Sequence, residues 1–163
     1  MKFIADGMLG KLARWLRMMG QDVTYNTKFN DNELLRLSKV ESRVLLTKDF
    51  ELYKRAISRG LESFYVEGKR ESERLAEIAK RYGLTLEIDM DKSHCPICNT
   101  PLKAAPKEEL KDKIEPNTYT YYDKFWRCPN CSQIYWQGAH WKQISNTIIQ
   151  AQQTTSSDSK KPS

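Results

Sequence analysis

The sequence predicts an α/β protein, a doubly wound parallel sheet with helices on both faces, followed by a small β zinc ribbon. Two observations support this. In the first ninety residues, short β-branched or aromatic runs alternate with longer helical patterns, which is typical of strand, helix, strand units. Beyond residue 90 the chain becomes polar and proline-containing, and it carries two C-x-x-C pairs. We therefore expect an α/β domain over 1–90, a ribbon over 91–149 and a disordered tail over 150–163.

The first domain is predicted to contain five strands and four helices. Strands are expected at residues 2–5, 22–25, 43–47, 63–66 and 84–88. The helix over 8–19 has Leu9, Leu12 and Leu16 at helical spacing and stops at Gly20, and a second helix covers 31–40. Two further helices begin near residues 50 and 71, and the last of them ends at Gly83.

The second part is predicted to form two cysteine knuckles joined by strands. The knuckles lie at 95–98 and 128–131, with an irregular excursion over 99–117 and strands at 119–122 and 133–136. Residues 150–163 are poor in apolar groups and rich in Ser, Thr, Gln and Lys, which predicts disorder.

The four cysteines predict a structural zinc site. Each C-x-x-C pair places two thiolates on a tight turn, so Cys95, Cys98, Cys128 and Cys131 supply four soft ligands for tetrahedral zinc. Disulfides are the alternative, but the chain shows no amino-terminal secretory segment, and C-x-x-C is poor geometry for an internal bridge. Four thiolates leave zinc no open position, so the metal folds the ribbon and does no chemistry.

Bulk properties exclude a membrane span and favour an anionic partner. The mean hydropathy is −0.70 and no long apolar run occurs. No segment reads as a targeting signal, and reduced thiols favour the cytoplasm. The formal charge of +6 suits an anionic partner, although such a charge is also ordinary for solubility.

Carboxylates follow the predicted strands repeatedly. Asp6, Asp49 and Glu67 come after the first, third and fourth strands, while Asp31 opens the helix after the second, with Glu33 close by. Because ligands bind beyond the carboxyl ends of parallel strands, these groups are expected at one edge, where Mg²⁺ or Mn²⁺ would neutralise them. Such ions bind a phosphodiester and activate water. The alternative is that the aspartates simply cap three helices.

Basic and aromatic residues suggest how RNA would be held. Lys11, Arg14 and Arg17 recur every three residues on the helix after Asp6, with Lys48 beside Asp49, and could follow a phosphate backbone or form a solvated face. In the ribbon, the aromatic residues, Trp136 among them, and His140 suit base stacking, but such residues also build the core of a small module.

Other catalytic classes lack their residues. Leu12 stands where a phosphate loop needs Ser or Thr, and no G-x-G-x-x-G follows the first strand, so no nucleotide cofactor is expected. His94 and His140 are the only histidines, and both belong to the ribbon. Triad catalysis is therefore excluded.

Four segments of the chain together resemble the Mut-seven C-terminal RNase family, namely 3–17, 31–35, 45–49 and 128–141. This resemblance implies a PIN-like nuclease domain fused to a zinc ribbon. Asp6 matches its first carboxylate and Asp49 that of its Thr-basic-Asp motif. The second acidic position matches Asp31 or Glu33, with Asp31 preferred, and the fourth has no clear match, Glu67 being a candidate.

The predicted function is a metal-dependent endoribonuclease. Asp6, Asp31 and Asp49 would hold Mg²⁺ or Mn²⁺, a metal-bound water would attack the phosphodiester, and the ribbon would help to grip RNA. The alternative is a catalytically weak or inactive module of the same fold that binds RNA or the ribosome, in line with the missing fourth carboxylate. A third hypothesis is a toxin-like nuclease controlled by a partner protein.

Overall fold

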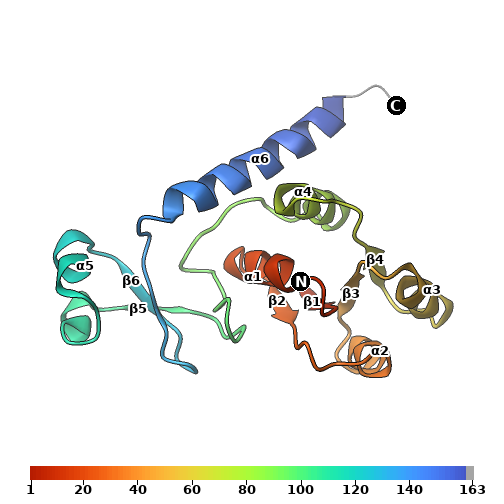
Figure 1. Cartoon of the computed structure of the whole chain (residues 1–163), viewed down its shortest axis with the longest axis horizontal. Coiled ribbons are helices and arrows are strands. Elements are labelled where there is room, and N and C mark those ends of the chain that lie inside the picture. Colours follow the sequence, from red (N-terminus) through yellow and green to blue (C-terminus); the bar gives the residue numbers. More distant parts are fainter. Residues whose placement is uncertain (161–163) are drawn as a thin grey trace.

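Four parallel strands form the larger of two sheets, in the order β2-β1-β3-β4. The computed structural model describes residues 1–160, and the side-chain surroundings of residues 1–156. The strands are β1 (Lys2–Ala5), β2 (Asp22–Thr24), β3 (Val44–Thr47) and β4 (Ser63–Tyr65). The helices between and after them are α1 (Gly10–Met18), α2 (Asp31–Val40), α3 (Phe50–Ser58) and α4 (Glu71–Tyr82). These eight elements confirm the predicted alternation (Figure 1).

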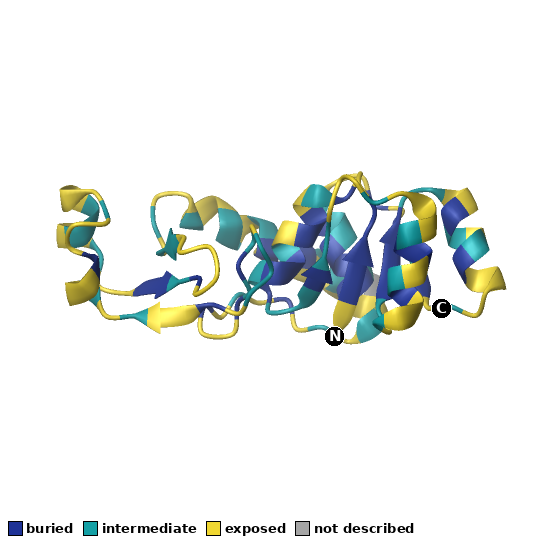
Figure 2. Cartoon of the chain, turned by 90° about the horizontal axis from the view of Figure 1, so that it is seen from below, coloured by how far each residue is buried: buried dark blue, intermediate teal, exposed yellow. Residues whose placement is uncertain are grey.

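Helices cover both faces of this sheet, as predicted. Side chains alternate between the faces along a strand, so Phe3 and Ala5 pack with α1 and α4 while Ile4 packs on the other side. That second face is covered by α2 and α3 through Leu34, Leu35, Leu52 and Ala56. The central strands β1 and β3 are accordingly buried on both sides, and Figure 2 shows them mostly in dark blue.

The expected strand over 84–88 does not form. Gly83 ends α4 in the left-handed conformation, φ 67°, and the chain then runs past α6 toward the ribbon (Figure 1). Leu86 is buried in the main core and its carbonyl accepts a hydrogen bond from Gln152 Nε2 at 2.7 Å. The apolar pattern of 84–88 therefore reflects packing between helices, and β4 is left as an edge strand.

The second sheet is small and antiparallel, in the order β5-β6-β7. It contains β5 (Lys103–Ala105), β6 (Phe125–Arg127) and β7 (Ile134–Tyr135). The excursion over 99–117 thus supplies a strand and a 3₁₀ turn, η1 (Lys107–Leu110). The predicted strand over 119–122 is wrong, because α5 (Pro116–Tyr121) occupies it. Pro116 stands at the start of this helix, and the Glu115 carboxylate accepts the Asn117 and Thr118 amides.

The predicted disordered tail is wrong for residues 150–160, which belong to α6 (Trp141–Lys160). Ile144, Ile148 and Ala151 recur at helical spacing, and the last two join the main core. The helix lies along α4 (Figure 1). A composition rich in Ser, Thr and Gln concealed this narrow apolar stripe. Residues 161–163 lie outside the described part. No helix in 1–160 is long and apolar enough to cross a membrane.

Candidate functional site

The four cysteines converge on one centre. Their Sγ atoms all lie within 4.8 Å of one another, and all four thiols are free. The Sγ atoms of Cys95 and Cys131 are 3.7 Å apart, and those of Cys98 and Cys128 are 3.4 Å apart. Tetrahedral zinc with bonds of about 2.3 Å separates its sulfurs by about 3.8 Å, whereas a disulfide needs about 2.05 Å. The site therefore fits a metal such as zinc and not two disulfides.

Tyr135 supports this centre from β7. Its hydroxyl lies 3.0 Å from Cys95 Sγ. Burial, and then the hydrogen bond to Cys95, raise the pKa of Tyr135 above its usual value. The phenol thus stays protonated and can donate to the sulfur, which is how neighbouring groups orient a metal ligand.

The first knuckle is fastened to the α/β domain by Arg17. This side chain is only 5% exposed, its Nε donates to Val23 O at 2.9 Å and its Nη1 donates to Pro96 O at 2.8 Å. Burial lowers the pKa of Arg17, and the nearby Cys95 and Cys98 oppose that shift. Burial and these bonds from Nε and Nη1 to the backbone of β2 and of the knuckle favour a structural role for Arg17 over the predicted contact with RNA.

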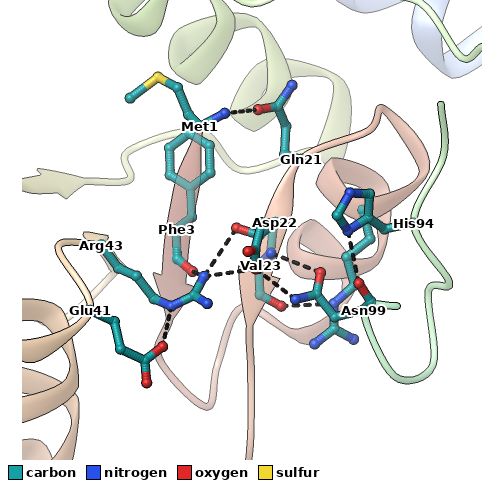
Figure 3. A network of polar contacts seen from close by, with 10 residues as sticks. Met1, Phe3, Gln21, Asp22, Val23, Glu41, Arg43, His94 and Asn99 are labelled. Atoms are coloured by element: carbon teal, nitrogen blue, oxygen red, sulfur yellow. Dashed lines mark hydrogen bonds and ion pairs between the residues drawn. The ribbon is translucent and has the colours of Figure 1, made fainter. Parts of the chain in front are cut away.

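A second junction joins Asn99 to the start of β2 (Figure 3). Asn99 Oδ1 accepts Val23 N at 2.9 Å, and its Nδ2 donates to Asp22 Oδ1 at 2.7 Å. Arg43 Nη1 donates to the same Asp22 oxygen at 2.8 Å. Burial raises the pKa of Asp22, but the bonds from Arg43 and Asn99 outweigh it and hold that pKa below its usual value.

This junction was missed from the sequence. Asp22 stands at the start of a predicted strand, and Asn99 begins the predicted irregular excursion. The sequence carries one signal, because Asn99 directly follows the first C-x-x-C and asparagine tolerates a positive φ. In the structure its φ is 73°. Asp22 and Arg43 lie at the amino ends of β2 and β3. The knuckle therefore docks at the amino ends of the strands, whereas Asp6 lies at the carboxyl end of β1.

Asp6 lies at the carboxyl end of β1 and is 5% exposed. Its Oδ2 accepts Thr47 Oγ1 at 2.5 Å and Lys48 N at 3.0 Å, and its Oδ1 accepts Met8 N at 2.9 Å. Asp49 N donates to the same Thr47 hydroxyl at 2.9 Å. Thr47 therefore joins Asp6 to the residue Asp49, as expected from the neighbouring ends of β1 and β3.

The capping alternative holds for Asp49. Its Oδ1 accepts Glu51 N at 3.0 Å and Leu52 N at 3.3 Å, at the start of α3. Asn30, not Asp31, caps α2, and Leu9 occupies the cap position of α1 without a side-chain bond. Capping accordingly explains one of the three aspartates, and leaves Asp6 and Asp31 to be explained otherwise.

The remaining acidic candidates make no hydrogen bond to Thr47, Asp6 or Asp49 among those of the described residues. Asp31 is exposed, and its Oδ2 lies 3.6 Å from Arg55 Nη1. Glu33 is half-buried and Glu67 is exposed. Among the described residues, the four cysteines form the only group of three or more potential metal ligands. Through Thr47 the structure connects the Asp6 carboxylate to the backbone amide of Asp49, and among the described residues Asp31, Glu33 and Glu67 form no metal-binding group with them.

The carboxylates of Asp6 and Asp49 retain acceptor lone pairs that no described donor uses. Two carboxylate oxygens offer about four lone pairs, and Asp6 uses three. Oδ2 of Asp49 accepts no hydrogen bond from the described residues. Mg²⁺ is usually held by one or two carboxylates, with waters and phosphate completing its shell. The donor set therefore fits such an ion without a third carboxylate.

Glu77 was another residue missed from the sequence. It reaches from α4 to accept Glu67 N at 2.8 Å and Gly68 N at 3.0 Å. Burial raises the pKa of Glu77 above its usual value despite these two bonds. It holds the loop that carries Glu67, and no local pattern announces a contact between residues ten positions apart.

The other candidates for RNA contact are spread over both domains. Lys11 and Arg14 are exposed on α1 and Lys48 is half-buried beside Asp49. Trp136 is half-buried, with its ring centroid 6.1 Å from that of Phe125, so it contributes to ribbon packing. His140 is exposed.

A model of the Mut7-C RNAse domain family matches residues 1–148. The matched region includes the parallel sheet with Asp6 and Asp49 as well as all four cysteines. No curated protein and no solved structure matches the chain.

Proposed function

Because the chain belongs to the Mut7-C RNAse domain family, we propose that it is a metal-dependent endoribonuclease with a PIN-like domain over 1–90 and a zinc ribbon over 91–149. The observation that carries the proposal is the Thr47 hydroxyl, which links Asp6 to Asp49 at the carboxyl edge of the sheet. Acidic residues at that edge are where an open parallel sheet binds its ligand.

Asp6 and Asp49 would hold Mg²⁺ or Mn²⁺, with Asp31 as a further ligand if it leaves Arg55. The metal, when bound, supplies Lewis acidity and lowers the pKa of a coordinated water. The chain's own part is to orient the Asp6 carboxylate through three donated hydrogen bonds and to hold Asp49 in place through its cap.

Lys11, Arg14 and Lys48 would bind RNA phosphates beside this edge. Lys11 and Arg14 project from α1, which begins four residues after Asp6. Cationic side chains without a buried partner supply the salt-dependent part of nucleic-acid affinity. Arg17 is not included, because its donors are used inside the protein.

The ribbon would have a structural zinc and a secondary role in holding RNA through Trp136 and His140. Since the first knuckle docks at the opposite sheet edge, these residues would contact RNA away from the cleaved bond. Cellular RNA, including ribosomal RNA, is the proposed partner, and the reduced thiols favour a cytoplasmic site of action.

The proposal is tested by cleavage of total cellular RNA with mapped cut sites. The wild-type protein should cleave with Mn²⁺ or Mg²⁺ and stop with EDTA, whereas Asp6→Asn and Asp49→Asn should lose cleavage. Asparagine also caps helices, so the second variant should keep its fold by circular dichroism. Asp112→Asn, an exposed residue of the ribbon, is the matched control and should cleave normally. Cleavage by both edge variants at the wild-type rate would sink the assignment.

One observation favours a second candidate function, an RNA-binding module without catalysis. The described carboxylates do not form a group of three, and Asp31 is paired with Arg55. In that case the same protein binds RNA in the absence of divalent metal and never cleaves it with Mn²⁺. The mapped assay separates the two functions directly.

A further inference from the structure

A cavity of about 430 Å³ lies against β4, beside α3 and α4. Its wall combines apolar side chains, Tyr53 and Ile57 from α3 and Phe64 and Tyr65 from β4, with polar ones, among them Arg81 from α4. Its size falls in the range of about 300–1,000 Å³ that binding pockets occupy. Because β4 ends the strand order, its outer side pairs with no strand in the described part of the chain.

Three aromatic rings meet at one end of this cavity. The centroids of Phe50 and Tyr65 are 5.3 Å apart at 68°, those of Tyr53 and Tyr65 are 6.0 Å apart at 41°, and those of Phe50 and Tyr53 are 6.0 Å apart at 27°. Phe50 nevertheless remains 51% exposed. A large apolar ring left open to water beside a cavity offers a surface for a second flat group.

This aromatic cluster adjoins the acidic edge. Phe50 directly follows Asp49, and Tyr65 is the register partner of Thr47, whose hydroxyl contacts Asp6. A nucleotide placed over the cluster would therefore have its phosphate near the two aspartates. Phe50, Tyr53 and Tyr65 come from two elements that only the folded sheet brings together.

The charges around the cavity favour a neutral ring inside it. Glu62 and Glu67 line the wall, so a phosphate would be repelled there. Two cations are near these carboxylates and rings: Arg81 of the wall lies 3.2 Å from Glu62, and Lys54 Nζ lies over the Phe50 ring, 5.2 Å from its centroid. Lys54 also pairs with Glu51 at 3.0 Å. This distribution of charge favours a neutral nucleobase inside the cavity and the RNA phosphates outside it.

We propose that Phe50, Tyr53 and Tyr65 form a stacking subsite for one base of single-stranded RNA, beside the phosphodiester that Asp6 and Asp49 address; this rests on the proposed ribonuclease function. The base stacks on the exposed face of Phe50, as bases do on the aromatic platforms of single-strand binders. Because β4 is the last strand of the described sheet, backbone groups on its outer side would hydrogen-bond the edge of the base.

The test uses full-length, zinc-loaded protein without Mg²⁺ or Mn²⁺, so that binding is measured without cleavage. Two short single-stranded RNAs are compared, one intact and one with a single abasic nucleotide. Phe50→Ala should weaken binding of the intact RNA about tenfold, within the range of one lost base stack, and Phe50→Trp should restore it. Tyr121→Ala, which removes an aromatic ring that is 78% exposed on α5, is the control and should bind within about twofold.

The abasic RNA distinguishes the loss of base stacking from a general loss of affinity for RNA. The wild-type protein should bind it about tenfold more weakly than intact RNA, and Phe50→Ala should bind both RNAs alike. An RNA with one 5-iodouridine should cross-link to Phe50, Tyr53 or Tyr65. Equal affinity of Phe50→Ala and wild type, cross-links confined to the ribbon, or binding of an extended peptide but no RNA would each overturn the inference.

The outcomes also separate this inference from the proposed function. Metal-dependent cleavage by a protein whose Phe50→Ala variant binds RNA normally removes the stacking subsite and leaves the nuclease. If binding depends on the base and on Phe50 but Mn²⁺ gives no cleavage, the stacking subsite is supported and the nuclease function is contradicted. Absence of any RNA binding by the wild type overturns both.

Discussion

Residues of the same type on one helix have opposite roles in this protein. Arg14 and Arg17 both lie on α1, but Arg14 is exposed while Arg17 is buried at the junction with the first knuckle. A spacing of three residues turns about 60° short of a full helical turn, so the row Lys11, Arg14, Arg17 rotates from solvent toward the apolar stripe. The drift explains why a regular basic pattern ends in a structural arginine.

Arg17→Met should lower the free energy of unfolding by about 2–4 kcal/mol, because buried carbonyls lose a charged donor. Urea unfolding measures this change. RNA affinity of the folded variant should keep its salt dependence, since Arg17 contacts no phosphate.

Arg14→Met is the matched control on the same helix. It should leave stability within about 0.5 kcal/mol and reduce the slope of log K against log salt by about 0.7 for the lost contact. A large salt effect in Arg17→Met with unchanged stability would contradict the placement of this residue.

At the scale of elements, residues 84–88 pack beside α6 and do not form the strand that the sequence predicts. The segment 84–88 and the helix cover the same face of the core, and Gln152 satisfies the Leu86 carbonyl. An extended segment can lie beside a sheet without joining it when side chains supply its hydrogen bonds. The edge of β4 stays open for this reason, and the aromatic cavity lies along it.

Ala151→Glu should destabilise the protein by about 2–4 kcal/mol, because Ala151 is fully buried in the main core and a carboxylate there has no partner. Chemical denaturation followed by circular dichroism measures the loss. Gln153→Glu, two residues later and exposed, carries the same new charge on the same helix and should have little effect. Equal stability of the two variants would show that α6 does not pack on the domain.

At the scale of the whole molecule, the zinc ribbon and the α/β domain share a hydrogen-bonded seam. Val23 N donates to Asn99 Oδ1, and Arg17 reaches the backbone of Pro96. The knuckle residues that make these contacts lie between or next to zinc ligands. Zinc bound by the four cysteines would therefore stabilise strand β2 as well as the ribbon, although this centre lies beyond the amino ends of the strands, opposite Asp6.

Removal of zinc should accelerate hydrogen exchange at the Val23 amide at least about tenfold, because Asn99 then loses its fixed position. The Leu45 amide, which donates to Glu62 O within the sheet at 3.0 Å, is the internal control and should change little. Metal analysis should first find about one zinc per chain, and less than about half an equivalent would count against four-thiolate binding. Unchanged Val23 exchange after zinc loss would refute the coupling.

The sequence by itself determined the alternation of strands and helices over residues 2–82, the parallel sheet and the four cysteines that converge on one centre. These depend on local chemistry, namely side-chain periodicity within a helix or strand and two thiolates on one turn. It placed Asp6 and Asp49 at one edge because parallel strands end together. It was wrong for residues 84–88 and for the tail, where side chains from distant segments decide the outcome, and for residues 119–122, where the Glu115 cap and Pro116 begin a short helix.

Only the tertiary structure decided which polar groups meet. Thr47 and Asp6 are 41 residues apart in the sequence, and Val23 and Asn99 are 76 apart. Burial of Arg17 likewise depends on a knuckle that lies 79 residues away. No local pattern encodes such pairs, because a hydrogen bond between remote segments forms only after the sheet and the ribbon have set their positions.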